Sequence, residues 1–251
     1  MKQATAPKSF SIGWDVGGWN CDKNSESRDA IVILDETTAI VGEPWRGNLR
    51  EFINNAATIS DWLKTLFIHC EANFPAEPLP VTMGIDTPLG FSDEFVKLVT
   101  NRVGVDSIGS SSTNRYLYRH TERRLFDQGL KPLSAVKDMI GSQATKGMHV
   151  LAKFAPQIES CGVWTDGRGF HTIETYPAAC RNTKAVKKFL NGRNRLKHDD
   201  MEDARICALV AHLFATERAA MEAPGNEVPQ SEGWIWVPQQ RGSTTNREGK
   251  G

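Results

Sequence analysis

Long hydrophobic runs are absent from this chain of 251 residues. Its longest uninterrupted apolar stretches are only a few residues, such as 31–34, whereas a membrane-spanning helix needs roughly 20. The first ten residues, MKQATAPKSF, also lack the apolar segment of a secretory signal. We therefore expect no membrane segment and a cytoplasmic location.

The chain also has no net charge and no closely spaced pair of cysteines. The 30 Lys and Arg residues balance 30 Asp and Glu residues, which excludes a uniformly basic nucleic-acid coat but leaves local basic patches open. The 5 cysteines are scattered and contain no CxxC pair. This pattern indicates reduced thiols and argues against a disulfide framework or a structural zinc.

What is present is typical of a globular domain with a substantial core. Apolar residues make up 39% of the chain and charged residues 24%, which excludes a disordered or coiled-coil body. We predict a single domain over residues 1–241 with a helical insert at about 92–155. The polar, glycine-rich end, residues 242–251, is predicted to be a flexible tail.

Hydrophobic spacing predicts a mixed sheet flanked by long helices. Period-two alternation or short apolar runs predict strands at 10–16, 30–34, 39–41, 81–86, 162–166 and 170–176, with a late extended segment at 233–237. Helical spacing covers 49–72, 185–190 and 200–219. The first three strands should be antiparallel, and the strand after the long helix should add in parallel. The class is α/β or α+β.

Two aspartates occupy matching positions at predicted strand ends. Asp15 lies in GWDVGG and Asp86 in GIDTPLG, each two residues after a glycine, Gly13 or Gly84. Glycine removes side-chain bulk, so a helix could approach the sheet closely there. Chain-breaking residues follow each aspartate, which places both carboxylates beside a crevice at the sheet edge.

Further acids are candidates for the same site. Asp200 and Asp203 are three apart at the start of the long predicted helix and share one face. Glu174 ends another alternating run. Acids at a helix start also serve as caps, a lone strand-end Asp is usually a turn-former, and Glu174 is evenly balanced between ligand and structural roles.

Converging carboxylates need a compensating cation. Acids that meet at one place cannot all stay ionised without one, and hard oxygen ligands select Mg²⁺ or Mn²⁺. Two such ions about 4 Å apart can activate water and stabilise the leaving oxygen of a phosphodiester. The predicted metal ligands are Asp15, Asp86, Asp200 and Asp203, and Glu174 is a further catalytic candidate.

The motifs GWDVGGW, GIDTPLGF, IETYPAA, HDDMEDARICALVA and EGWIWVP, in this order, resemble those of domain-of-unknown-function family 429. That family is regarded as predicted nucleases with an RNase H-like fold, and the resemblance spans roughly residues 10–238. It implies a sheet of three antiparallel strands followed by parallel ones. It also implies two metals held by Asp15, Asp86 and the pair Asp200 and Asp203, whose spacing is similar to that of RuvC-type Holliday-junction resolvases.

The sequence departs from that superfamily in two places. The insert between Asp86 and Glu174 is long, and Glu174 has no assured counterpart in the well-studied nucleases.

Two basic clusters are candidate contacts for DNA or RNA. The first interleaves arginines with tyrosines, which suit phosphate contact and base stacking, and the second lies directly before the acidic helix, so that it could draw a phosphate backbone towards the metals. The residues are Arg115, Arg119, Arg123 and Arg124 in the insert, and Lys187, Lys188, Arg193, Arg195 and Lys197 before the acidic helix. A solvated surface is the alternative interpretation of each.

The combined prediction is a hydrolase: a divalent-metal-dependent nuclease that uses water as the nucleophile. One alternative is an ATP-using enzyme related to actin and sugar kinases, because the segment 15–18 (DVGG) resembles their first phosphate loop. However, the sequence contains no later glycine-rich phosphate loop of that kind. A second alternative is a non-catalytic nucleic-acid-binding module of the same fold. A homodimer is compatible with each.

Overall fold

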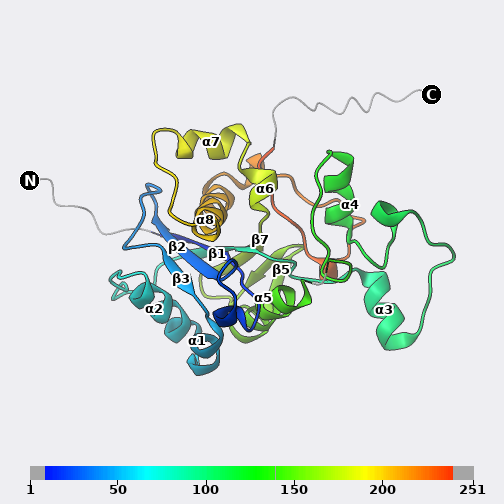
Figure 1. The fold of residues 1–251 in the computed structure, drawn as a ribbon, viewed down its shortest axis with the longest axis horizontal. Coiled ribbons are helices and arrows are strands. Elements are labelled where there is room, and N and C mark those ends of the chain that lie inside the picture. Colours follow the sequence, from blue (N-terminus) through cyan, green and yellow to red (C-terminus); the bar gives the residue numbers. More distant parts are fainter. Residues whose placement is uncertain (1–8, 139, 240–251) are drawn as a thin grey trace, which may run out of the picture.

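A seven-stranded mixed sheet forms the centre of the protein in a computed structural model that describes residues 9–138 and 140–239 (Figure 1). The predicted tail at 242–251 lies outside the described residues. The strand order is β3-β2-β1-β4-β7-β6-β5. The strands are β1 (Phe10–Asp15), β2 (Asp29–Asp35), β3 (Trp45–Gly47), β4 (Val81–Asp86), β5 (Gln157–Ser160), β6 (Val163–Thr165) and β7 (Phe170–Glu174).

Strand directions follow the expected layout from β3 to β7, whereas β6 and β5 add antiparallel beyond β7. β1 and β2 pair antiparallel, as do β2 and β3. β4 adds in parallel to β1, and β7 adds in parallel to β4. The fold is therefore α/β with a mixed sheet, consistent with an RNase H-like layout, and the predicted class is confirmed.

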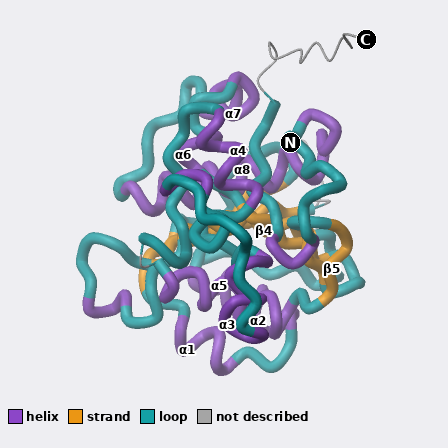
Figure 2. The backbone as a smooth tube through the Cα atoms, turned by 90° about the vertical axis from the view of Figure 1, so that its right-hand side faces the viewer, coloured by secondary structure: helices purple, strands orange, loops and turns teal. Residues whose placement is uncertain are grey.

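Helices cover both faces of the sheet (Figures 1 and 2). One face packs against α1 (Arg50–Asn55), α2 (Ile59–His69) and α5 (Gly141–Phe154), and the other against α6 (Pro177–Cys180), α7 (Lys184–Leu190) and α8 (Asp199–Glu217). Alternation along β1 sends Ile12 and Trp14 into the first layer. α8 is buried along most of its length, because it crosses the middle of the sheet on the second face.

The third strand lies later in the chain than predicted. The run 39–41 forms only an isolated bridge between Leu34 and Ile40, and the strand that pairs with β2 is β3. In the turn between them, Asp35 Oδ1 accepts hydrogen bonds from the backbone amides of Thr37 and Ala39. The late segment 233–237 is likewise extended but joins the sheet only by a bridge between Glu174 and Ile235.

The predicted helix 49–72 is two helices. Ala56 is extended, and Thr58 begins α2 with a capping box in which Thr58 and Asp61 exchange hydrogen bonds. The apolar spacing continues across the break because both helices bury the same side against the sheet. Spacing alone therefore could not locate the break.

The chain between β4 and β5 holds the predicted helical insert, with α3 (Asp93–Asn101), α4 (His120–Asp127) and α5. α3 extends away from the sheet at the right of Figure 1, whereas α5 packs into the core. In the part of the chain that the structure describes, no helix has the length and apolar character needed to cross a bilayer.

Candidate active site

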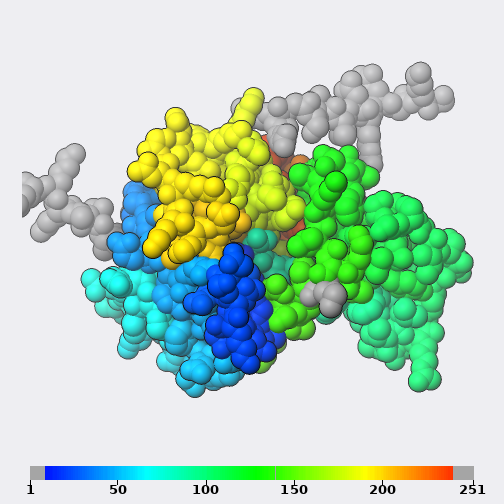
Figure 3. Space-filling model, in the orientation of Figure 1, coloured from blue at the N-terminus to red at the C-terminus, as the bar shows by residue number. Residues whose placement is uncertain are grey.

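Asp15 and Asp86 lie side by side at one edge of the sheet. They are the last residues of β1 and β4 and are directly paired in the parallel register. Both line a cavity of about 200 Å³, whose walls also come from Ser27, Tyr176 and Leu133. These walls belong to the blue, yellow-green and green surfaces that meet near the middle of Figure 3.

Glycines on β1 and β4 allow α8 to pack closely against the sheet. A Cβ placed on Gly13 would overlap the carbonyl oxygen of Ala204, and one on Gly84 would overlap that of Cys207. Both obstacles are helix backbone, which has little room to move. The predicted close approach of a helix is confirmed, and it brings the first turns of α8 towards the two strand ends.

Neither the Asp15 nor the Asp86 side-chain carboxylate makes a hydrogen bond or an ion pair with another described residue. Burial is the main cause that raises the pKa of both carboxyls well above its usual range. The charges of Asp86 and Asp203 raise the pKa of Asp15 further, and those of Asp203 and Glu174 do the same for Asp86. The two carboxyls therefore have no positive partner to balance their charge, and a bound cation would supply one.

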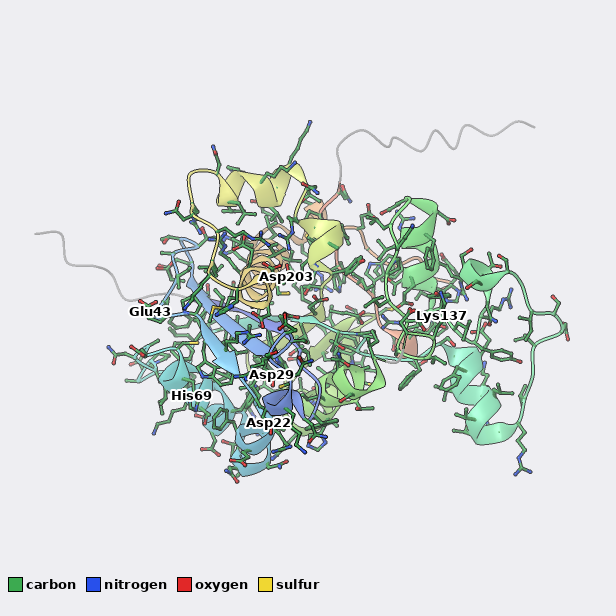
Figure 4. The ribbon with its side chains drawn as sticks, in the orientation of Figure 1. Asp22, Asp29, Glu43, His69, Lys137 and Asp203 are labelled. Carbon is green, nitrogen blue, oxygen red and sulfur yellow. The ribbon has the colours of Figure 1, made fainter. Side chains whose placement is uncertain are left out.

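Asp200 and Asp203 lie at the start of α8, as predicted, but each already has an arginine partner. Asp200 is 8% exposed and forms an ion pair with Arg46 of β3. Asp203 forms one with Arg181 after α6. Figure 4 places Asp203 towards the middle of the molecule. Burial raises the pKa of Asp203, and the Arg181 charge opposes that shift.

As the side chains lie, the described residues contain no group of three or more His, Cys, Asp or Glu able to hold a metal ion. The donor set still fits a hard divalent cation, because Asp15 and Asp86 offer unpaired carboxylate oxygens at one place. The Thr87 hydroxyl, on the cavity wall, is buried without a hydrogen-bond partner. Asp203 would complete a three-carboxylate set by exchanging Arg181 for the ion.

Glu174 makes the contacts of a structural residue, which is one of the two roles that the sequence left open. Its carboxylate receives two hydrogen bonds from the Arg119 guanidinium, with Nη1 to Oε2 at 2.8 Å, and a third from the Leu89 amide at 2.9 Å. Arg119 also pairs with Glu122 and is only 3% exposed. Glu174 lines the same cavity, but its oxygens are engaged in anchoring the insert and the 87–90 loop that follows Asp86.

The buried position of Arg119 corrects its prediction as a nucleic-acid contact, because a phosphate cannot reach it in this structure. Its neighbours differ in exposure. Arg124 is exposed and donates to Glu222 at 3.1 Å, Arg123 donates to the Tyr118 carbonyl, and Arg115 lies 3.8 Å from Glu94.

The second basic cluster is exposed and lies on α7 and in the segment between α7 and α8. Lys187, Lys188 and Lys197 have no ion-pair partner among the described residues. Arg193 donates to the Thr38 carbonyl, and Arg195 pairs with Asp199 at 2.8 Å. The three lysines are therefore free to meet a phosphate backbone.

Sequence reasoning missed a buried ion pair between Lys146 of α5 and Asp29 at the start of β2. Both side chains are fully buried. Asp29 Oδ1 also accepts from Trp14 Nε1 at 3.0 Å and from the Gly17 amide at 2.9 Å. One signal was available, because Lys146 precedes Val150 and Phe154 at four-residue spacing on the buried face of α5.

This ion pair organises the chain that follows Asp15. Lys146 Nζ donates to the carbonyls of Gly17 and Gly18 at 3.3 and 3.4 Å. The Gly17 amide donates a hydrogen bond to Asp29 Oδ1, and the Trp19 amide donates one to Ser142 Oγ at 2.9 Å. A phosphate-binding loop needs free backbone amides, so these contacts weigh against the ATP-binding alternative.

No protein-family model, curated protein or solved structure matches this chain.

Proposed function

We propose that the protein is a metal-dependent nuclease that hydrolyses phosphodiester bonds with water as the nucleophile. The observation that carries the proposal is the unpaired, register-matched pair of Asp15 and Asp86 in an open cavity, with Asp203 close enough to raise the pKa of both. Neighbouring carboxylates without a positive partner are costly to a fold. A bound divalent cation would offset the repulsion between these carboxylates, which explains why a functional site would keep them together.

Asp15 and Asp86 would hold Mg²⁺ or Mn²⁺, and Asp203 and Asp200 would be further ligands. Such ions lower the pKa of a bound water and stabilise the charge on the leaving oxygen. Arg181 and Arg46 keep the two helix carboxylates oriented, and each arginine released from its partner would be free to face a substrate phosphate. Lys187, Lys188 and Lys197 would guide the backbone.

We also propose membership of domain-of-unknown-function family 429. What supports it is the placement of the quoted motifs: GWDVGGW and GIDTPLGF end β1 and β4, HDDMED opens α8, and IETYPAA carries Glu174 at the end of β7. A cytoplasmic location remains our prediction, and the 5 cysteines, all within the described residues, are free thiols as that location requires.

The deciding experiment is a cleavage assay. Purified protein is incubated with single- and double-stranded DNA, RNA and a branched junction, in Mg²⁺, Mn²⁺ or EDTA. Asp86→Asn tests the site, and Asp106→Asn, an exposed acid in the insert, is the matched control. We expect metal-dependent cleavage by the wild type and the control, and its loss in Asp86→Asn.

Two results would redirect the proposal. If the Asp86→Asn protein cleaved as well as the wild type, the site would be misassigned. If nothing were cut while nucleic acid bound equally in EDTA and Mg²⁺, the non-catalytic binding module would replace the nuclease.

A further inference from the structure

A second hollow lies in the insert, next to the acidic cavity. Its volume is about 390 Å³, which is within the range of about 300–1,000 Å³ for small-molecule sites. Residues 129–133 form one wall, and Tyr118, Phe126 and Lys137 form much of the rest. Because 132–133 also line the acidic cavity, one segment separates the two spaces.

The hollow presents positive charge. Lys131 and Lys137 are exposed, and neither has an acidic partner within ion-pair distance among the described residues. Lys137 Nζ donates to the Tyr118 hydroxyl at 2.9 Å and lies 5.6 Å from the centre of that ring. Asp138, the acid in the lining, accepts a hydrogen bond from the Ser134 amide at 2.8 Å. Figure 4 labels Lys137 in the insert, to the right of Asp203.

The same hollow has an aromatic and aliphatic surface. Phe126 packs edge-on against Tyr118, with ring centres 4.8 Å apart and planes at 88°. Leu133 is 53% exposed on the segment between the two spaces. An exposed leucine beside a partly exposed phenylalanine and two lysines without an acidic partner matches the two parts of a nucleotide, a flat base and an anionic phosphate.

We propose that this hollow binds an unpaired nucleotide next to the scissile phosphate, so that the substrate is a single-stranded nucleic acid; this inference rests on the proposed nuclease function. The base lies against Leu133 and Phe126, and the adjoining phosphate lies near Lys131 and Lys137. Bases in a duplex are stacked inside the helix, whereas an unpaired base exposes the face that such a surface needs. Leu133 lies between that nucleotide and Asp86.

Binding without catalysis tests the inference directly. Fluorescein-labelled single-stranded DNA and RNA of 12 nucleotides, and matched duplexes, are titrated in EDTA at several salt concentrations, with anisotropy as the readout. Lys131→Ala and Lys137→Ala remove the charges, and Leu133→Ala removes the apolar contact. Lys64→Ala, an exposed lysine on α2, is the matched control.

We expect each insert lysine variant to bind the single strands several-fold more weakly. The log–log salt slope should fall by about 0.7 for each lost phosphate contact to a single strand. Leu133→Ala should weaken binding about five-fold without changing the slope. Lys64→Ala should bind as the wild type does, and the duplexes should bind more weakly than the single strands.

Unchanged affinity in all three insert variants, no single-strand binding by the wild type, or preferred binding of duplex would each overturn the inference. Its failure is distinguishable from failure of the nuclease. A protein that binds in the hollow but cuts nothing sustains the nucleotide site and refutes the nuclease. A protein that cuts in Mn²⁺ while its lysine variants bind and cut normally sustains only the nuclease.

Discussion

Replacing Asp86 by Asn should make the metal-free protein more stable. Asp15 and Asp86 are paired in register on adjacent parallel strands, which lie about 4.8 Å apart. At an effective dielectric constant of about 20, two unit charges at that separation repel by ~3 kcal/mol. Because burial raises the pKa of both carboxyls, the pair takes up a proton more readily and part of this repulsion is relieved, so we expect the variant to gain about 1–3 kcal/mol. For a domain of this size, that is a rise in Tm of about 2–12 °C.

The gain should depend on pH in a defined direction. Burial raises the folded-state pKa of both carboxyls, whereas the unfolded Asp titrates near its ordinary value, about 3.9. At a pH between the ordinary pKa of the unfolded Asp and the raised pKa of the folded state, the folded state binds more protons than the unfolded state. Wild-type stability therefore falls as the pH rises through this range. The loss of wild-type stability caused by ionising these two carboxyls is absent below about pH 4. It grows as the pH rises above that value and levels off once the pH exceeds the raised pKa.

Thermal unfolding in EDTA between pH 4 and pH 8 measures this. Asp200→Asn is the control, because Asp200 has Arg46 as a partner and its loss should not stabilise the protein. Adding Mn²⁺ should raise the Tm of the wild type and leave that of Asp86→Asn nearly unchanged. An Asp86→Asn protein that is less stable than the wild type at pH 8, or equally affected at pH 4 and pH 8, would refute the reasoning.

Three further substitutions probe the surroundings of the site. Gly13→Ala should destabilise by about 1–3 kcal/mol or more, because its Cβ overlaps the backbone of α8; urea unfolding measures it, and an unchanged midpoint would contradict the close packing. Lys146→Met should cost about 3–5 kcal/mol by leaving the Asp29 carboxylate buried without its cation, and adding Asp29→Asn should restore part of that loss in a double-mutant cycle. Glu174→Gln should increase proteolysis of the insert, because Arg119 loses a charged partner, yet leave Mn²⁺ affinity within about two-fold; a larger fall in affinity would return Glu174 to the metal ligands.

Sequence patterns located most of the sheet and its two central acids. Alternation identified β1 and β4 almost to the residue, and the repeated Gly-x-Asp frame identified Asp15, Asp86 and the approach of a helix over Gly13. These succeed because side-chain alternation and the missing Cβ are local properties of the chain.

Other features depended on partners far away in the sequence. The sequence left Glu174 between a ligand and a structural role, and its contact with Arg119, 55 residues earlier in the chain, favours the structural one. Lys146 and Asp29 are 117 residues apart. Neither residue of such a pair carries a local mark of its partner, because an ion pair forms wherever the fold brings opposite charges together.

The sequence by itself determined the class of fold, the strand ends that carry Asp15 and Asp86, and the acidic start of α8. Only the tertiary structure decided which acids remain without a partner. Arg46 forms an ion pair with Asp200, and Arg181 forms one with Asp203. Arg119 pairs with Glu174. The side chains of Asp15 and Asp86 have no such partner and line the cavity. The physical reason is that a carboxylate's state depends on the charges and solvent around it, and these are set by packing between elements distant in the chain.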